Sequence, residues 1–273
     1  MTARASVGFL YDDIPYLKIG HGPPLVMVQG LTPEHDVPEG WQRRMGLSVA
    51  TPLARHFTVY AVNRKRGLEP GESMSDIAGY LARAIEHDLG EPVFLQGTST
   101  GGSVVLQLAV DRPDLVRRLV VTASAYRLGP RGRWLQAEMA RLTRARDGRE
   151  AWAFMMTSQM PPPLRGPLRP LARRAVGSMV PDDPTDMLVT MDAEDVFDVE
   201  ADLPRISAPT LVIGGGKDPF YPRELFEGTA AGVQDGRVHI FEDWGHMRTS
   251  ASRATTNLTL GFMLAGTPIR AGH

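Results

Sequence analysis

The fold of this chain is indicated most directly by the stretch Val93-Phe94-Leu95-Gln96-Gly97-Thr98-Ser99-Thr100-Gly101-Gly102. It begins with a short apolar run that is typical of a buried strand, and residues 103–110 after it carry the spaced apolar side chains of a helix. Ser99 falls between the two patterns. The sequence therefore predicts one hydroxyl group at a corner where a strand passes into a helix.

The neighbours of Ser99 suit such a corner. Gly97 and Gly101 lie two positions before and after it, and glycine lets the flanking backbone pass close without a Cβ clash. A helix that begins directly after Ser99 points free N–H groups and the positive end of its dipole at the same spot, which favours an anion there. We interpret this G-x-S-x-G pattern as a nucleophile elbow.

Composition limits the classes of function. A chain of 273 residues can form one large core, or one core with an inserted lobe. It carries 30 Lys and Arg against 31 Asp and Glu, so its net charge of -1 gives no field that would attract nucleic acid or an anionic membrane. Without cysteine there is no disulfide, thiol nucleophile or cysteine-bound zinc. We recognise no metal-ligand cluster and no nucleotide-binding loop, and we expect no metal and no cofactor.

Targeting signals are not recognised either. Residues 1–12 lack the apolar core of a signal peptide, and no apolar run approaches the roughly 20 residues that cross a bilayer. We expect a cytoplasmic protein that acts on a small molecule, not on nucleic acid or a membrane. The sequence leaves the oligomeric state open.

Strand and helix patterns alternate along most of the chain. A capping box at Ser73–Asp76 opens a predicted helix with Ile77 and Leu81 on its apolar face. A polar loop is expected to run through Trp41, with a short helix at residues 52–56, and one closing helix at residues 250–264. The predicted strands lie at residues 7–11, 14–19, 25–29, 57–62, 93–98, 119–121, 210–214 and 237–241. This alternation predicts an α/β fold with a mostly parallel central sheet flanked by helices.

The alternation stops between about Tyr126 and Ala201. Residues 134–157 and 184–199 have helical patterns, and prolines at 161–163 interrupt them. We predict a core domain formed by residues 1–125 and 202–273, and a helical lid inserted at residues 126–201. Ordinary crossover helices are the alternative.

Chemistry in an open parallel sheet gathers at the carboxyl ends of the strands. Asp218 and His246 follow the two predicted strands at residues 210–214 and 237–241, as Ser99 follows its own. A serine hydroxyl needs a base, and histidine, whose ordinary pKa is about 6.5, needs a carboxylate to fix its tautomer. We predict these three as a catalytic triad. Asp243 is an alternative acid, although a surface or capping role suits its position better.

The residue order Ser, Asp, His resembles that of the α/β-hydrolase family, and the resemblance runs from about Val7 to Leu264. It implies that Ser99 is the nucleophile, His246 the general base and then acid, and Asp218 the orienting acid. It further implies an oxyanion hole formed by the backbone N–H groups of Leu31 and Thr100. The sequence matches the family most specifically at residues 97–102, at the Asp218 turn after residues 208–214, and at residues 245–246.

Two segments depart from the family pattern. The third strand ends in Gln29-Gly30 where His-Gly is usual, and residues 63–67 read Asn-Arg-Lys-Arg-Gly in place of Asp-x-Arg-Gly. The backbone donor survives the first change, because the residue after Gly30 supplies it. The polar network around the hole must then be rebuilt, for which Gln29, Thr32 and His35 are candidates.

The resemblance implies a serine esterase or lactonase that cleaves an apolar ester or lactone through an acyl-enzyme. Candidates for its pocket are Gln29, Thr32, His35, Met155 and Met247. For Met155 and the other lid methionines, packing inside the lid is the favoured alternative. Three other functions stay open: hydrolysis of a carbon–carbon bond, cofactor-free peroxidase or perhydrolase chemistry with the same triad, and a ligand-binding sensor with slow turnover.

Overall fold

A computed structural model describes residues 5–265, apart from the side chain of Ser178. Its strands form one eight-stranded sheet in the order β1-β2-β4-β3-β5-β6-β7-β8. In chain order the strands are β1 (Ser6–Leu10), β2 (Ile14–Gly20), β3 (Pro24–Val28), β4 (Thr58–Val62), β5 (Val93–Thr98), β6 (Val116–Thr122), β7 (Thr210–Gly215) and β8 (Gly236–Phe241).

Most of this sheet is parallel. Only the pairs β1–β2 and β2–β4 are antiparallel, and from β4 through β3, β5, β6, β7 and β8 all neighbours run the same way. Every residue of β3 and β7 is buried, as expected for strands covered on both faces. The predicted α/β fold class is confirmed. The parallel strands also end at one common edge of the sheet, where loops can bring distant residues together.

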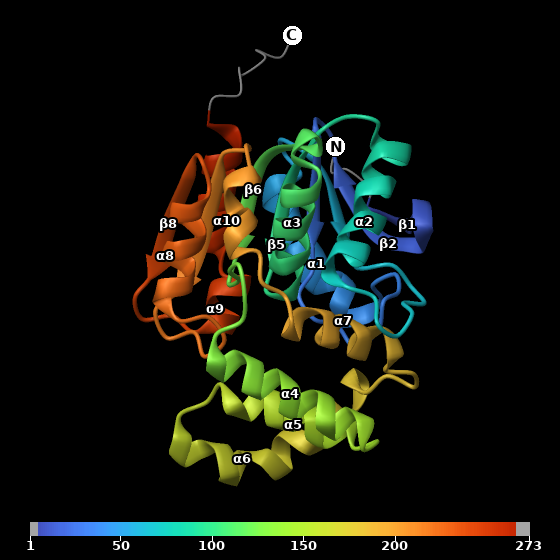
Figure 1. The fold of residues 1–273 in the computed structure, drawn as a ribbon. Helices are drawn as coiled ribbons and strands as arrows, with labels where there is room; N and C mark the ends of the chain where they lie inside the picture. Colours follow the sequence, from blue (N-terminus) through green and yellow to red (C-terminus); the bar gives the residue numbers. More distant parts are fainter. Residues whose placement is uncertain (1–4, 266–273) are drawn as a thin grey trace.

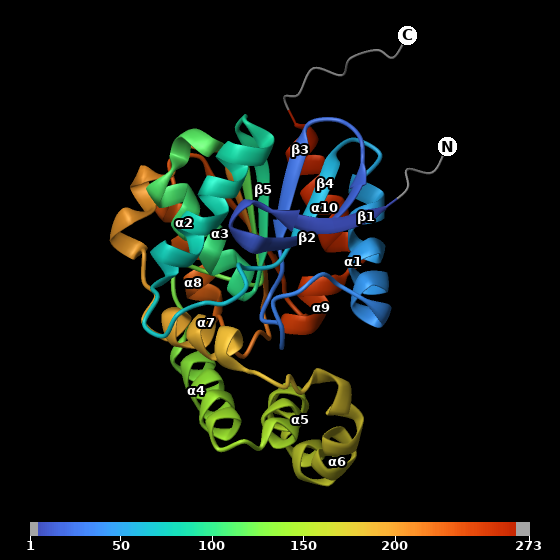
Figure 2. The same cartoon turned by 90° about the vertical axis from the view of Figure 1, so that its right-hand side faces the viewer.

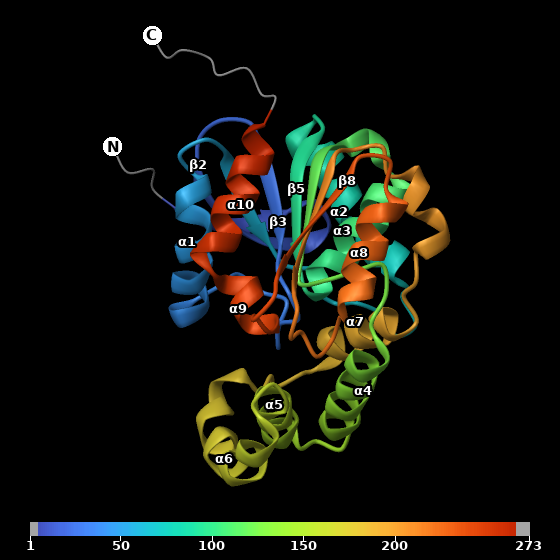
Figure 3. The same cartoon turned by 90° about the vertical axis from the view of Figure 1, so that its left-hand side faces the viewer.

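Helices cover both faces of the sheet (Figure 2, Figure 3). Helices α2, α3 and α8 lie on one face, and α1, α9 and α10 lie on the other. The helices of the protein are α1 (Gly40–Leu53), α2 (Met74–Ala84), α3 (Thr100–Asp111), α4 (Pro130–Arg144), α5 (Gly148–Ser158), α6 (Pro162–Ala175), α7 (Thr185–Asp195), α8 (Arg223–Gly232), α9 (His246–Ala251) and α10 (Arg253–Leu264). Within residues 5–265, none of them combines the length and apolar character needed to span a membrane.

Each face of the sheet has its own apolar core. On the first face Leu81 of α2, Val104 of α3 and Leu225 of α8 belong to one cluster with the sheet. On the second face Leu53 of α1 and Phe262 of α10 belong to another. The sheet is therefore held from both sides, which fixes the positions at which its strands end.

Local signals in the sequence placed α2 correctly and α1 wrongly. Ser73 caps α2 and forms the predicted capping box with Asp76. The predicted polar loop is present but ends at Glu39, and the predicted short helix at 52–56 is wrong, because one helix, α1, begins at Gly40 and ends at Leu53. Among its residues only Ala50 and Leu53 are buried, so its apolar stripe is too narrow to be recognised. The single closing helix is also divided, at Ser252, into α9 and α10.

The segment between β6 and β7 is helical. Helices α4, α5 and α6 lie together beyond one end of the sheet, and α7 lies between them and the core (Figure 1). The predicted helical stretch 134–157 is two helices, separated at residues 145–147, where Arg146 has a positive φ of 60°. We call residues 126–201 the inserted segment.

Candidate active site

Ser99 occupies a strained corner between β5 and α3. Its φ of 53° and ψ of -128° are unusual for a residue with a Cβ, and backbone hydrogen bonds hold it there. Its N–H donates to the carbonyl oxygen of Thr122 at 2.9 Å, and its own carbonyl oxygen accepts from the N–H of Gly102 at 2.6 Å. This backbone conformation places the hydroxyl group of Ser99 at the edge of the sheet, beside the first turn of α3.

The glycines of the elbow are required by space. A Cβ on Gly97 would lie 2.2 Å from the carbonyl oxygen of Gly101, and a Cβ on Gly101 would lie 2.3 Å from that of Val28. Helix α3 therefore rests directly on the backbone of β3 and β5. This contact is why α3 can begin immediately after the strand.

Three side chains from three loops form a hydrogen-bonded chain. His246 Nε2 lies 2.9 Å from Ser99 Oγ, and His246 Nδ1 lies 2.7 Å from Asp218 Oδ2. The other carboxylate oxygen of Asp218 accepts from the backbone N–H groups of Phe220 and Tyr221 at 2.8 and 3.3 Å. Because the N–H donor to Asp218 is on Nδ1, Nε2 is free to accept the proton of the serine hydroxyl.

His246 is held in a fixed orientation by its surroundings. It is 7% exposed, and the ring of Phe220 packs against it with centroids 4.7 Å apart. Asp218 is also buried, whereas Asp243 is exposed and its carboxylate pairs with Lys217 at 2.7 Å. The alternative acid Asp243 thus lies outside the hydrogen-bonded chain.

The two backbone N–H groups expected to stabilise an oxyanion lie beside Ser99. Thr100 is the first residue of α3, and Gly30 is so close that a Cβ on it would lie 3.3 Å from Ser99 Cβ. Among residues 5–265, the N–H groups of Leu31 and Thr100 have no hydrogen-bond acceptor. Two unpaired donors beside the Ser99 hydroxyl are the arrangement that an oxyanion hole would need.

A cavity of about 320 Å³ contains Ser99 and His246. Leu31, Met155 and Met247 form part of its wall, but Gln29, Thr32 and His35 do not. The pocket prediction is therefore wrong for these last three residues. Met155 faces the cavity as well as its neighbours in the inserted segment, so packing is not its only role.

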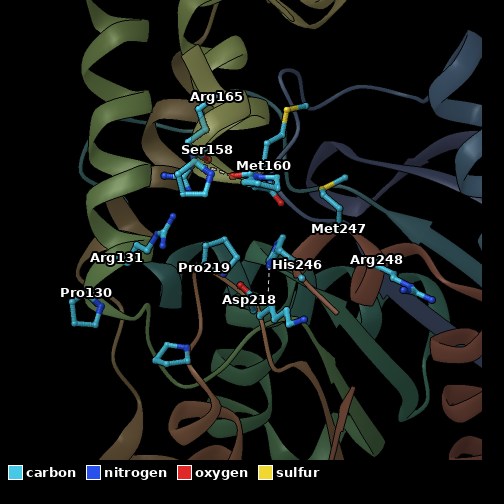
Figure 4. A pocket seen from close by; sticks show the side chains of 16 residues that line it. Pro130, Arg131, Ser158, Met160, Arg165, Asp218, Pro219, His246, Met247 and Arg248 are labelled. Carbon is cyan, nitrogen blue, oxygen red and sulfur yellow. Dashed lines mark hydrogen bonds and ion pairs between the residues drawn. The ribbon is translucent and has the colours of Figure 1, made fainter. Parts of the chain in front are cut away.

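A wider cavity of about 900 Å³ adjoins the same histidine. Figure 4 shows Asp218 and His246 joined on the core side, with Arg131, Arg165 and Met160 of the inserted segment across from them. The site therefore lies between the sheet edge and the inserted segment. Within residues 5–265, no group of three or more His, Asp or Glu side chains is arranged to hold a metal ion.

Comparison with known proteins identifies the family of this chain. A model of the alpha/beta hydrolase family matches residues 21–255. The chain belongs to the alpha/beta hydrolase family. A solved alpha/beta hydrolase enzyme from a Medee basin deep-sea metagenome library matches 94% of this chain and 97% of its own, with a TM-score of 0.79 and 18% identity, which shows the shared fold.

Curated relatives match the chain at 25 to 28% identity. A pimeloyl-[acyl-carrier protein] methyl ester esterase of Neisseria meningitidis serogroup C is 28% identical over 60% of this chain, and the match covers 66% of that relative, just under two thirds. A protein of the same name from Nitrosomonas europaea is 25% identical over 83% of this chain and 90% of its own length.

This alpha/beta hydrolase has a buried arginine behind the loop after β3. Arg64 is 2% exposed and follows β4. Its Nε donates to His35 Nε2 at 3.1 Å, while its terminal nitrogens donate to the carbonyl oxygens of Gln29 and Gly30 at 3.0 and 3.1 Å and to Thr32 Oγ1 at 3.1 Å. The residues predicted to rebuild the polar network therefore contact Arg64.

The protonation of this network follows from burial. Burial, followed by the charge of Arg64, lowers the pKa of His35 to about 3, so its ring is neutral at physiological pH. Its Nδ1–H donates to the carbonyl oxygen of Lys65 at 2.9 Å, which leaves Nε2 as the acceptor for Arg64. Burial also lowers the pKa of Arg64, to about 10, and the guanidinium keeps its charge near neutral pH.

A buried glutamate contacts the other side of the site. Glu194 on α7 is 1% exposed and accepts hydrogen bonds from Thr100 Oγ1 at 2.9 Å and Ser103 Oγ at 2.8 Å. Burial raises the pKa of its carboxyl group. Neither Glu194 nor Arg64 is among the site residues predicted from the sequence. Arg64 carries a signal, because it follows a strand at the chemically active edge of the sheet, but Glu194 is one of several acids in an acidic helix.

Proposed function

We propose that this protein is a serine hydrolase that cleaves a carboxylic ester or lactone through an acyl-enzyme on Ser99. The observation that carries the proposal is the chain of contacts from Asp218 to His246 to Ser99, at 2.7 and 2.9 Å. The names of the relatives, which are ester-cleaving enzymes, support the same class of bond. Family membership by itself is compatible with other chemistry.

In the proposed reaction Ser99 Oγ attacks the ester carbonyl carbon while its proton passes to His246 Nε2. The carbonyl oxygen becomes an oxyanion that accepts hydrogen bonds from the N–H groups of Leu31 and Thr100, each worth about 3 kcal/mol to the transition state. His246 then gives its proton to the departing alcohol oxygen. Water attacks the acyl-enzyme by the same route in reverse and releases the acid.

The role of Asp218 in these steps is to hold the imidazole. Its carboxylate accepts from Nδ1–H, so that Nε2 faces the serine, and it stabilises the imidazolium that forms when the proton arrives. The two backbone N–H groups on its second oxygen keep the carboxylate from turning away. All of these groups lie on loops whose ends the sheet fixes.

The proposed substrate has an apolar acyl or alcohol part. The cavity beside Ser99 is walled by methionine and aromatic side chains, among them Trp41, Met139, Trp152, Met155, Met156 and Phe220. Several of these come from the inserted segment, and we propose on that ground that residues 126–201 act as the lid of a core formed by 1–125 and 202–273. A small-molecule ester fits a cavity of about 320 Å³ better than a polymer does.

The test is hydrolysis of p-nitrophenyl esters of increasing acyl length, together with fluorophosphonate labelling and intact mass measurement. We expect one label on the wild-type protein and none on Ser99→Ala, with kcat reduced about 10⁶-fold where chemistry limits the rate. Ser75→Ala is the matched control. The Ser75 hydroxyl contacts Asp111, which is the last residue of α3, whereas Ser99 precedes the first residue of that helix.

The outcomes separate the proposed hydrolase from its rivals. Labelling without ester turnover would favour carbon–carbon bond or perhydrolase chemistry at the same serine. The absence of labelling on the wild type would contradict an activated nucleophile, and the protein would then fit a ligand-binding sensor.

A further inference from the structure

The oxyanion-hole loop of this protein is held by an unusual set of contacts. The loop after β3 carries the peptide between Gly30 and Leu31, and it begins with Gln29, whose N–H extends the β3–β4 pairing by donating to the carbonyl oxygen of Val62 at 3.1 Å. Beyond that bond the loop leaves the sheet. Its next two carbonyl groups, those of Gln29 and Gly30, accept from the two terminal nitrogens of Arg64.

This contact decides which way one peptide faces. The peptide bonds of the described chain are trans, so the carbonyl oxygen of Gly30 and the N–H of Leu31 point in opposite directions. The carbonyl oxygen of Gly30 faces Arg64, because it accepts a hydrogen bond from the guanidinium at 3.1 Å. The Leu31 N–H must then point away from Arg64, towards the cavity that Leu31 and Ser99 share.

We infer that Arg64 is a positioning residue for the oxyanion hole, because its guanidinium fixes the Gly30–Leu31 peptide with the N–H of Leu31 directed at the oxygen that forms on the substrate. This inference rests on the proposed function. If the peptide rotated by half a turn, the Gly30 oxygen would face Ser99 in place of the donor, and a carbonyl dipole there would repel an oxyanion.

The geometry of arginine suits this task better than that of lysine. Arg64 presents a planar fork that reaches two successive carbonyl groups at 3.0 and 3.1 Å, and its remaining contacts to His35 and Thr32 stop the fork from turning. A lysine ammonium could reach one carbonyl but would not define the plane of the peptide. Asn63 donates to Thr32 Oγ1 at 2.9 Å and to the carbonyl oxygen of Glu34 at 3.0 Å, and so supports the same loop from its other end.

The network also explains the departure from the family's usual His-Gly. In this chain the supporting side chains come from residues 63 and 64 and from His35, not from the residue before Gly30. Arg64 can remain charged in the interior because the buried Glu194 and the half-buried Asp186 on α7 attract it. The inserted segment thus places negative charge near the guanidinium.

The test compares two ligands on Arg64→Met and Arg64→Lys. A trifluoromethyl ketone adds to Ser99 Oγ as a tetrahedral anion that fills the oxyanion hole, whereas the methyl ketone of the same chain length binds without forming that anion. We expect Arg64→Met to weaken binding of the trifluoromethyl ketone about 10²-fold and to lower kcat/KM for a matched ester by a similar factor. Binding of the methyl ketone should change by less than about 3-fold, and Arg64→Lys should lie between Arg64→Met and wild type.

The control is Arg118→Met. Arg118 is half-buried and also donates to a backbone carbonyl, that of Phe262 at 3.1 Å, but it lies on β6 against α10. It should leave both ketones unchanged. The Arg64 variants are first shown to be folded by a cooperative thermal unfolding transition. If such a variant binds both ketones equally weakly, or binds both as tightly as the wild type does, the inference is wrong. Should Arg64→Met fail to fold, Arg64→Lys decides by the same ratio. If the wild type neither cleaves esters nor binds the trifluoromethyl ketone, the proposed function fails first.

Discussion

The two N–H donors beside Ser99 lie on segments that are built in different ways. Thr100 belongs to the elbow, where α3 rests directly on the backbone of β3 and β5 through Gly97 and Gly101. Leu31 belongs to a loop that buried ionisable side chains hold from behind. The elbow is fixed by close backbone packing, and the loop by hydrogen bonds to Arg64. The elbow is marked by a short pattern around Ser99, although Gly101 packs on the distant Val28 of β3, whereas the loop joins residues about 30 positions apart without any local pattern.

The largest effect is expected from filling the space that the elbow needs. In Gly97→Ala the new Cβ would lie 2.2 Å from the carbonyl oxygen of Gly101 and 2.5 Å from Val105 Cγ2, and backbone cannot move aside as a flexible side chain can. We expect a loss of about 3 kcal/mol in the free energy of unfolding. Urea unfolding followed by circular dichroism measures it.

The matched control is Gly261→Ala on the exposed side of α10, where a Cβ meets nothing within 4 Å. This change should stabilise the protein by up to about 1 kcal/mol, because alanine favours a helix over glycine. If Gly97→Ala proved as stable as wild type, the elbow would not depend on close backbone contact.

This difference accounts for what the sequence could and could not predict. Ser99, Asp218 and His246 each follow a predicted strand, so the rule that chemistry gathers at strand ends predicts that they lie together. Gly97 and Gly101 are recognisable because they flank Ser99 at the fixed spacing of the G-x-S-x-G pattern. Arg64 and Glu194 were not found, because nothing in a local pattern tells that a charged side chain is buried and which distant carbonyl or hydroxyl groups it meets.

The pocket predictions failed for a related reason. The sequence predicts pocket positions for Gln29, Thr32 and His35 because they follow β3. The position of a residue along the chain, however, does not tell to which side of the loop its side chain points. His35 faces Arg64 behind the loop, whereas Met155 and Met247 face the cavity. The apolar stripe of α1 is too narrow to be recognised among its polar residues. Helix α2 is recognisable because it has a broad apolar face and a capping box.

A second prediction uses the pH dependence of the loop network. His35 has a pKa of about 3 in the folded protein, against an ordinary value of 6.5. As the pH falls below 6.5 the unfolded chain takes up a proton that the folded protein refuses, so stability falls with pH, by up to about 1.4 kcal/mol per pH unit for this one group. The loss continues until the pH passes below the folded pKa.

His35→Gln should remove this part of the slope, because glutamine does not titrate. Urea unfolding at several pH values between 4.5 and 7.5 gives the wild-type and variant slopes, and their difference isolates His35 from the carboxylates that titrate in the same range. His21→Gln, at an exposed turn, is the matched substitution outside the network. Equal slopes for His35→Gln and wild type would mean that His35 is charged or exposed.

The smallest effect on activity is expected from a substitution at Glu194. This substitution tests most directly whether the elbow and the loop after β3 are held in different ways. Glu194 contacts the donor-bearing elbow through Thr100 Oγ1 and Ser103 Oγ, much as Arg64 contacts the donor-bearing loop. Its contacts reach side chains, however, and the Thr100 N–H is directed by the start of α3 and the glycine packing beneath it. In Glu194→Gln the amide oxygen can still accept one hydroxyl, and the other hydroxyl can turn to accept from the amide nitrogen. We therefore expect kcat/KM for a p-nitrophenyl ester to fall by less than about 5-fold, equivalent to about 1 kcal/mol.

The contribution of Glu194 to wild-type stability has the opposite pH dependence from the contribution of His35. Burial raises the pKa of Glu194 above its ordinary value of 4.5, so the folded protein keeps a proton that the unfolded chain releases as the pH rises. Wild-type stability therefore declines with rising pH above about 4.5 through this group, and Glu194→Gln should lack that decline. A loss of activity in Glu194→Gln as large as that of Arg64→Met would contradict the distinction between the two segments. Both donors would then depend on buried charge, and the elbow would need α7 as much as the loop needs Arg64.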